Sequence, residues 1–178
     1  MSWSMQSLPD FTDEDFERWR KLLEERSGIH LVPQQRTFLK SQLSIRMREL
    51  GGISADDYYN QLRDGVRGMV EWSNLLDRLV VKETSFFRHI PSFDFIRNQV
   101  LQKIASGQMG SSFDVWSVGC ATGEEPYSLA MLLNECFSLA ESNVFWGVQA
   151  TDISLQALNY GRKGIYPLRK ADMVDSDI

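Results

Sequence analysis

Trp116-Ser-Val-Gly-Cys-Ala-Thr-Gly-Glu-Glu-Pro-Tyr-Ser128 is the stretch that decides the fold of this 178-residue chain. Its pattern predicts the end of a buried strand, a glycine turn and the beginning of a helix. Gly119 and Gly123 bracket the turn, where a side chain would crowd either the backbone or a ligand. Pro126 is typical of the first turn of a helix, because its missing N–H would have no partner there. A strand, a tight glycine turn and a helix N-terminus together often bind a ligand in α/β proteins.

The predicted turn is acidic, which limits the ligands that it suits. Glu124 and Glu125 favour the helix dipole, but they would repel a pyrophosphate. The glycine spacing is G-x-x-x-G, which differs from the G-x-G-x-x-G of dinucleotide-binding folds and disfavours a nicotinamide dehydrogenase. The stretch also lacks the Gly-Lys-Ser/Thr of a P-loop. The turn therefore suits a cationic or zwitterionic ligand, such as one with an α-ammonium group. The alternative is a plain strand-to-helix turn with solvated acids.

The composition is that of a globular protein and excludes several classes. The chain is 43% hydrophobic and 24% charged, and its net charge of −5 disfavours non-specific nucleic-acid binding. Apolar runs are shorter than the roughly 20 residues of a membrane span, and the N-terminus lacks a signal-peptide pattern, so a membrane protein is not expected. Cys120 and Cys136 have neither metal-ligand spacing nor a disulfide framework. We predict two free thiols in a reducing compartment and no metal site.

About the first 80 residues predict four amphipathic helices that form a small bundle with its own core. Thr12-Asp-Glu-Asp15 has the pattern of a capping box at the start of the first helix, and Ser27-Gly28 ends it. The second helix is predicted over about residues 33–50. Ser54 caps the third helix, which stops near Gly65, and the fourth comes directly after it.

The predicted second helix carries a local excess of positive charge. Against one acid, Glu49, it has four basic residues: Arg36, Lys40, Arg46 and Arg48. In a chain of negative net charge, such a surface suits docking of an acidic helical partner. The alternative is a solvated helix face without a partner.

A short mixed segment, Glu83-Thr-Ser-Phe-Phe-Arg88, joins the bundle to the remainder of the chain. Thr84 and Arg88 are four positions apart, so a helical turn would place them on one side. The alternative is an ordinary linker whose phenylalanines seal a contact between domains. A fifth helix is predicted over about residues 92–105.

From residue 113 the hydrophobic period changes from that of helices to that of strands. Residues 113–118 and 144–150 are predicted strands, and each is followed by a predicted helix. This βαβα order indicates parallel strands with a right-handed crossover. Asp152 comes after the second strand, where an acid can accept hydrogen bonds from both hydroxyls of a ribose. The alternative is that Asp152 caps the next helix, a role for which Ser154 competes.

Three stretches resemble the chemotaxis receptor methyltransferases, the CheR family. They are Glu-Thr-Ser-Phe-Phe-Arg at 83–88, Gly-Cys-Ala-Thr-Gly-Glu-Glu-Pro-Tyr-Ser at 119–128 and Ala-Thr-Asp-Ile at 150–153. Their order and spacing also match the family, as do the helical region in front and Gly-Ile-Tyr-Pro at 164–167. The resemblance covers about residues 11 to 170.

The resemblance implies cytoplasmic bacterial enzymes of signal transduction. They use S-adenosylmethionine to methylate glutamate side chains on the cytoplasmic helices of chemoreceptors, with S-adenosylhomocysteine as product. Carried over by position, the cofactor-binding residues are Thr84, Arg88, Gly119, Gly123, Glu125 and Asp152. Lys82 stands where the family usually has Asn, so one contact to the cofactor differs. The basic second helix matches the family's receptor-docking surface.

Little catalytic machinery is expected, because a glutamate carboxylate has a pKa near ~4.3 and is ionised at neutral pH. Catalysis would come from alignment of the reactants and from replacing the water around the carboxylate. We expect Arg88 to act as the catalytic residue by orienting that carboxylate or balancing the charge of the site.

The predicted fold class is α/β: a small helical bundle and then the first βαβα part of a Rossmann-like methyltransferase sheet. The predicted domains are an all-α receptor-docking domain over 1–82, a linker and connecting helix over 83–112, and the beginning of the cofactor-binding domain over 113–178. Such a sheet has about seven strands in the family, and only two are recognisable here. We therefore expect an N-terminal portion that is inactive alone, with its half-sheet covered by another copy or by a second chain. The alternative function is a non-catalytic module that docks on chemoreceptor helices.

Overall fold

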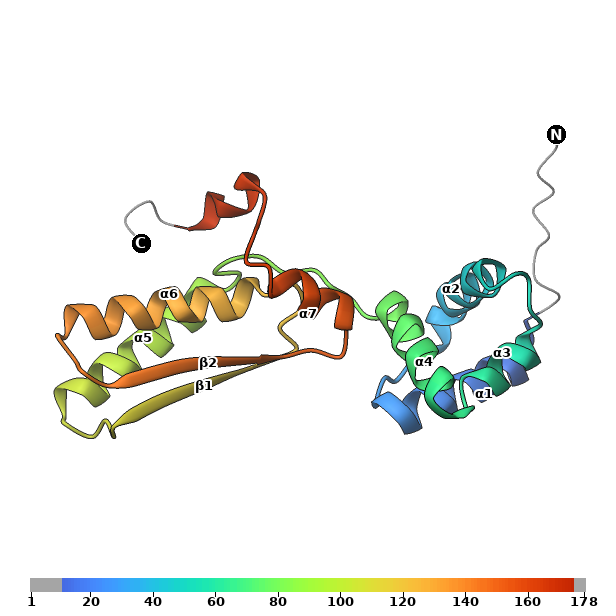
Figure 1. Cartoon of the computed structure of the whole chain (residues 1–178), viewed down its shortest axis with the longest axis horizontal. Coiled ribbons are helices and arrows are strands. Elements are labelled where there is room, and N and C mark those ends of the chain that lie inside the picture. Colours follow the sequence, from blue (N-terminus) through green and yellow to red (C-terminus); the bar gives the residue numbers. More distant parts are fainter. Residues whose placement is uncertain (1–10, 175–178) are drawn as a thin grey trace. The chain divides into compact units, whose positions relative to one another are not determined.

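The computed structural model describes residues 11–174 and divides after Leu79 into two compact units (Figure 1). The first unit contains four α-helices, and the second contains three α-helices and two strands. Within residues 11–174, none of the helices combines the length and the apolar character that crossing a membrane requires. The same residues contain no group of histidine, cysteine and carboxylate side chains that could hold a metal ion.

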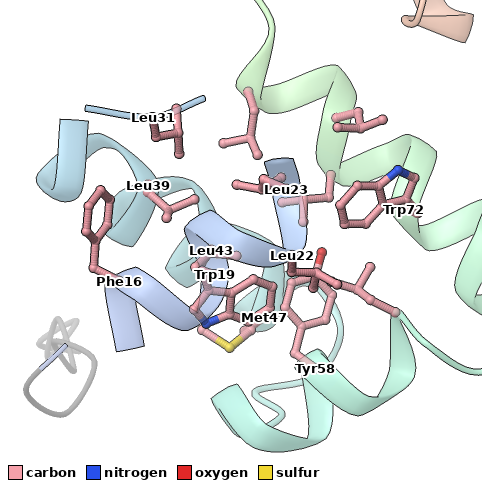
Figure 2. Close-up of a cluster of buried hydrophobic side chains, with 14 of the residues drawn as sticks. Phe16, Trp19, Leu22, Leu23, Leu31, Leu39, Leu43, Met47, Tyr58 and Trp72 are labelled. Carbon is pink, nitrogen blue, oxygen red and sulfur yellow. The ribbon is translucent and has the colours of Figure 1, made fainter. Parts of the chain in front are cut away.

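The helical unit forms the bundle that the sequence predicts. Its elements are α1 (Asp13–Ser27), a 3-10 turn η1 (Pro33–Gln35), α2 (Arg36–Glu49), α3 (Ala55–Gln61) and α4 (Gly65–Leu79). The bundle has one apolar core, shown in Figure 2, to which all four helices contribute buried side chains. Trp19 of α1 and Tyr58 of α3 are the largest of those that are almost fully buried.

The helix ends in this unit lie where local sequence signals place them. The Oγ1 atom of Thr12 accepts from the Asp15 N–H at 3.1 Å, and the Asp15 carboxylate accepts from the Thr12 N–H at 2.9 Å. This reciprocal pair is the predicted capping box. Gly28 ends α1 with a φ of +71°, a left-handed conformation that glycine adopts without a Cβ penalty. Ser54 caps α3 through the Asp57 N–H.

The second unit has the predicted βαβα order. Its elements are α5 (Ile90–Ala105), β1 (Ser112–Val118), α6 (Glu124–Leu139), β2 (Phe145–Thr151), α7 (Leu155–Gly161) and a 3-10 helix η2 (Leu168–Met173). The strands pair in parallel, with Ser112 opposite Phe145 and Val118 opposite Thr151. Their carboxyl ends therefore meet at one end of the sheet, where both subsequent turns begin (Figure 1).

The two faces of this sheet have different surroundings. Helices α5 and α6 cover one face and enclose a core that includes Val100, Leu132 and Phe137. On the other face, Trp116, Val118 and Phe145 are 65%, 67% and 82% exposed. Parallel sheets in α/β proteins are usually covered on both faces. The apolar open face is consistent with the incomplete Rossmann-like fold expected from the sequence.

Candidate functional site

The turn between β1 and α6 is attached to the end of β2 through its backbone. The N–H groups of Gly119 and Cys120 both donate to the carbonyl oxygen of Thr151, at 2.8 and 3.0 Å. Three residues of the turn have positive φ: Gly119 at +75°, Ala121 at +46° and Gly123 at +97°. The turn therefore bends sharply between the strand and the helix, as the glycine spacing predicts.

The two glycines of the turn are required for different reasons. A Cβ on Gly123 would lie 2.7 Å from the Tyr166 hydroxyl and 3.1 Å from the Gly161 Cα, so the protein itself fills that space. A Cβ on Gly119 would meet nothing within 4 Å. Glycine is thus required at position 119 only by the left-handed backbone conformation, and the space beside its Cα is empty. Of the two positions, only Gly119 leaves room for a ligand to approach.

Asp152 connects the two turns at the carboxyl ends of the strands. Its carboxylate oxygens accept from the Ala121 N–H and the Ser154 N–H, both at 2.7 Å. Ser154, rather than Asp152, is the N-cap of α7, and its hydroxyl accepts from the Ala157 N–H at 3.0 Å. Each carboxylate oxygen has a second lone pair, and Asp152 remains partly exposed. It is therefore fixed in place and still able to accept hydrogen bonds from hydroxyls.

The two neighbouring glutamates of the turn have opposite environments, and the expectation that both line the ligand site is wrong. Glu125 is exposed, and the Ser117 hydroxyl donates to its carboxylate at 2.7 Å. Glu124 is fully buried, and its carboxylate accepts from Thr122 and pairs with Lys170. Of these two glutamates, only Glu125 presents a negative charge to a ligand. The charge argument for a cationic or zwitterionic ligand therefore rests on that residue.

The segment that contains Thr84 and Arg88 does not form the helical turn that would place them on one side. Residues 82–85 are irregular and residues 86–89 form a tight turn, in which Phe87 has a φ of +48°. Arg88 is exposed and donates to the Glu83 carbonyl oxygen at 2.8 Å. Phe86 and Phe87 are buried, and their ring centroids lie 5.0 Å from those of Tyr166 and Phe93 in the same unit.

A pocket of about 530 Å³ lies between β2, α6 and α7. Of the predicted cofactor-binding residues, Gly123 and Asp152 line it, whereas Thr84, Arg88, Gly119 and Glu125 do not. Its walls are largely apolar and include Trp146, Val148 and Leu158. The structure therefore brings Gly119, Gly123, Glu125 and Asp152 to the carboxyl ends of the two strands. Thr84 and Arg88 lie on a separate segment and do not line the pocket.

Cys120 has a packing role in the turn. Its side chain is buried, and burial, together with the nearby Asp152 carboxylate, raises the pKa of the thiol. A thiol that stays protonated at neutral pH is a poor nucleophile. This agrees with the interpretation of Cys120 as a small residue that fills the turn.

The four basic residues of α2 are not equally available to a partner. Arg46 is held in the bundle, because its guanidinium donates to both carboxylate oxygens of the buried Glu71. Arg36 pairs with Asp13 and also donates to the Phe11 carbonyl oxygen. These two side chains already have partners within their own unit.

Lys40 and Arg48 differ from the other two basic residues of α2. Neither has an acidic partner among residues 11–174. Arg48 is exposed and only donates to the Ser44 carbonyl oxygen, at 3.2 Å, within its own helix. The charge of α2 that remains available to a partner is therefore concentrated on Lys40 and Arg48.

Comparison with known proteins supports the family suggested by these features. Residues 14–80 match the family described as "CheR methyltransferase, all-alpha domain", and residues 82–178 match "CheR methyltransferase, SAM binding domain". The chain belongs to the CheR methyltransferase family. The match confirms the predicted class of fold and S-adenosylmethionine as the cofactor of the second domain.

Several CheR relatives show the same extent of similarity. The chain is 33% identical over 161 residues to "Chemotaxis protein methyltransferase" of Borreliella burgdorferi, covering 89% of this chain and 56% of the relative. It is 33% identical over 155 residues to the protein of that name from Escherichia coli, covering 87% and 51%. For Klebsiella aerogenes the identity is 34% over 161 residues, covering 90% and 52%. The chain thus spans about half the length of these relatives.

The sequence interpretation missed three residues that hold the turn between β1 and α6 and the start of α6 in place. Ser117 fixes Glu125, Ser128 accepts from the Phe87 N–H at 3.0 Å, and Lys170 pairs with Glu124. Serines 117 and 128 are buried, yet a lone serine within an apolar run has no periodic signal. Lys170 lies 46 residues from its partner, a distance that local patterns do not cover.

Proposed function

We propose that this chain is part of an enzyme of the bacterial cytoplasm that methylates glutamate side chains on the helices of chemoreceptors. S-adenosylmethionine would be the methyl donor. The observation that carries the proposal is the turn between β1 and α6. It leads into the exposed carboxylate of Glu125 and donates a hydrogen bond to the fixed carboxylate of Asp152, which follows β2, so both acids lie at the carboxyl ends of the parallel strands. This edge of an α/β sheet is where ligands bind.

The chain's own residues fit the two ends of the cofactor. Glu125 carries a negative charge that would attract the α-ammonium group, and Ser117 holds that carboxylate in one orientation. Asp152 has unused lone pairs for the ribose hydroxyls, because its two backbone donors occupy only part of its accepting capacity. The open space at Gly119 lets a ligand approach the backbone between them.

The proposed chemistry requires positioning rather than acid–base groups. Held by Glu125 and Asp152, the cofactor would supply an electrophilic sulfonium methyl group for transfer to a carboxylate oxygen, with S-adenosylhomocysteine as the other product. The accepting carboxylate is already ionised at neutral pH, so a general base has no task. Arg88 is exposed and cationic, which suits the role of orienting that carboxylate.

Calorimetry with S-adenosylhomocysteine tests the cofactor part of this proposal. We expect the chain to bind it, and we expect Glu125→Gln to weaken binding about tenfold, because a hydrogen-bonded charge contributes about 1.4 kcal/mol or more. Glu141→Gln is the matched control, since Glu141 is exposed and lies just beyond the C-terminal end of α6, away from the turn. Equal affinities of the wild type and Glu125→Gln would contradict the assignment of Glu125.

A second function, docking on chemoreceptor helices without catalysis, is favoured by Lys40 and Arg48, the two cations of α2 that lack an acidic partner among the described residues. We expect Lys40→Glu and Arg48→Glu to weaken binding to an acidic receptor helix, with a strong dependence on salt. Glu substitution of Lys21 on α1, which lies near Glu25, is the control for a general loss of positive charge. Binding of receptor helices without binding of S-adenosylhomocysteine would favour docking alone for this chain.

A further inference from the structure

We propose that Lys170 is a positioning residue for the turn between β1 and α6, residues 119–123, which we call the cofactor turn. Lys170 acts through the buried carboxylate of Glu124. Its effect on cofactor binding rests on the proposed function. The contacts from which it is argued all lie within the described part of the second unit. Lys170 belongs to η2, which comes after the last α-helix, whereas Glu124 begins α6 directly after the glycine turn. The ion pair therefore attaches η2 to the first residue of α6, directly after the turn.

Glu124 is well placed to transmit the position of Lys170 to the turn. Its side chain is fully buried, and the Thr122 hydroxyl donates to one carboxylate oxygen at 2.6 Å while the Lys170 ammonium pairs with the other. A buried carboxylate without a cation is strongly destabilising. Loss of Lys170 would consequently favour movement of the Glu124 carboxylate out of its buried position. That movement would displace the residues that flank Gly123.

The main chain of Glu124 continues this connection toward the proposed substrate side. The Glu124 carbonyl oxygen accepts from the Ser128 hydroxyl at 2.7 Å, and the Ser128 oxygen accepts from the Phe87 N–H at 3.0 Å. Phe87 directly precedes Arg88, the residue proposed to orient the accepting carboxylate. Movement of the first turn of α6 would therefore also move the segment of Arg88.

Tyr166 makes a second attachment between the segment after α7 and the cofactor turn. Its hydroxyl donates to the Thr122 carbonyl oxygen at 2.6 Å. Its ring lies 5.0 Å from that of Phe86, 5.8 Å from that of Tyr127 and 5.6 Å from that of Tyr160, all in edge-on arrangements. Residues 166–170 thus hold both the cofactor turn and the segment before Arg88, and we call residues 166–170 the clasp.

Hydrogen exchange of the wild type and its variants tests the clasp without any ligand. Lys170→Met should accelerate exchange roughly tenfold in residues 86–88 and 120–125, while β1 and the helical unit stay unchanged. Lys170→Arg should retain wild-type exchange, because it keeps the charge. The double substitution Glu124→Gln with Lys170→Met should restore protection, because the buried site is then neutral. Lys163→Met, at an exposed lysine of the same segment, should behave as wild type.

Binding of S-adenosylhomocysteine by the same proteins tests the functional consequence. We expect Lys170→Met to weaken binding roughly tenfold at a temperature where all variants are folded. The Arg variant and the neutral pair should bind as the wild type does. Absence of binding by the wild type would contradict the proposed function but leave the exchange result to judge the clasp.

Three outcomes would overturn the clasp. The first is faster exchange of Lys170→Met that is confined to residues 168–173, because Lys170 would then stabilise only its own segment. The second is a neutral double variant as perturbed as Lys170→Met, because Lys170 would then not act through Glu124. The third is a Lys170→Arg variant that is folded but shows the same local acceleration, because charge pairing with Glu124 would then not position the turn. This comparison also judges the clasp if Lys170→Met unfolds globally.

Discussion

The guanidinium of Arg46 binds both carboxylate oxygens of Glu71, with Nε and Nη2 at 2.7 and 2.6 Å. The Tyr58 hydroxyl donates to the same carboxylate at 2.8 Å, so that α2, α3 and α4 meet at one buried charge. Only 5% of Glu71 is exposed. A residue predicted from the sequence to meet a partner is therefore an internal connection of the bundle.

Removing one member of this pair should destabilise the helical unit. We expect Arg46→Met to lower the free energy of unfolding by about 3 kcal/mol, because it leaves the Glu71 carboxylate buried without a cation. Arg46→Lys should recover only part of the loss, since an ammonium group cannot bind both oxygens in the same geometry. Exchange of backbone amides in α2 and α4 measures the effect, and Arg48→Met serves as the exposed control. A neutral result for Arg46→Met would show that water replaces the guanidinium without cost.

The same carboxylate should make the stability of the helical unit depend on pH. Burial alone raises the pKa of Glu71, but hydrogen bonds from Arg46 and Tyr58 outweigh it and lower the pKa below its usual value. The stabilisation is therefore complete above the unfolded pKa of about 4.3 and is lost as the pH falls through the lower folded pKa. The difference in unfolding free energy between the wild type and Glu71→Gln should shrink from pH 7 to pH 3. A constant difference would mean that Glu71 does not titrate in this range.

The two glycines of the cofactor turn provide a matched comparison. Gly119→Ala should cost about 1–2 kcal/mol, because only the left-handed backbone is strained. Gly123→Ala should cost more, since its Cβ also meets the Tyr166 hydroxyl and α7. Thermal unfolding of both variants measures the difference. Equal effects would indicate that the residues behind Gly123 move aside freely.

Arg88 should affect catalysis without affecting the fold. Its side chain is exposed and its one hydrogen bond is to a nearby carbonyl oxygen, so Arg88→Ala should leave thermal unfolding unchanged within about 0.5 kcal/mol. In an enzyme that contains this chain and the remainder of a CheR protein, methylation should fall by at least about tenfold. Unchanged turnover would remove Arg88 from the proposed mechanism.

The open face of the sheet should make this chain associate with a covering surface. Trp116, Val118 and Phe145 are exposed apolar side chains on one face of adjacent strands, and the faces of parallel sheets are usually covered. We expect self-association that weakens at least tenfold in Trp116→Thr, measured by light scattering against concentration. Leu168→Thr, at an exposed leucine outside the sheet, is the control. A monomer at all concentrations would contradict self-association.

Local signals in the sequence determined the elements of both units. Thr12 with Asp15, Gly28 and Ser54 act within a few residues of the helix ends that they set, so their effect can be read without the fold. The change from helical to strand periodicity likewise predicted the parallel pair and the turn at its end. The positions of Gly119 and Asp152 resulted from that order of elements.

Tertiary structure alone decided which charges remain available. Glu124 and Glu125 are adjacent and chemically identical, yet one is fully buried with Lys170 and the other is exposed beside Ser117. Arg46 and Arg48 are separated by one residue, yet only Arg46 meets the buried Glu71. Charges interact through space and have no periodic sequence signal, so their partners, 46 and 25 residues away, appear only when the chain has folded.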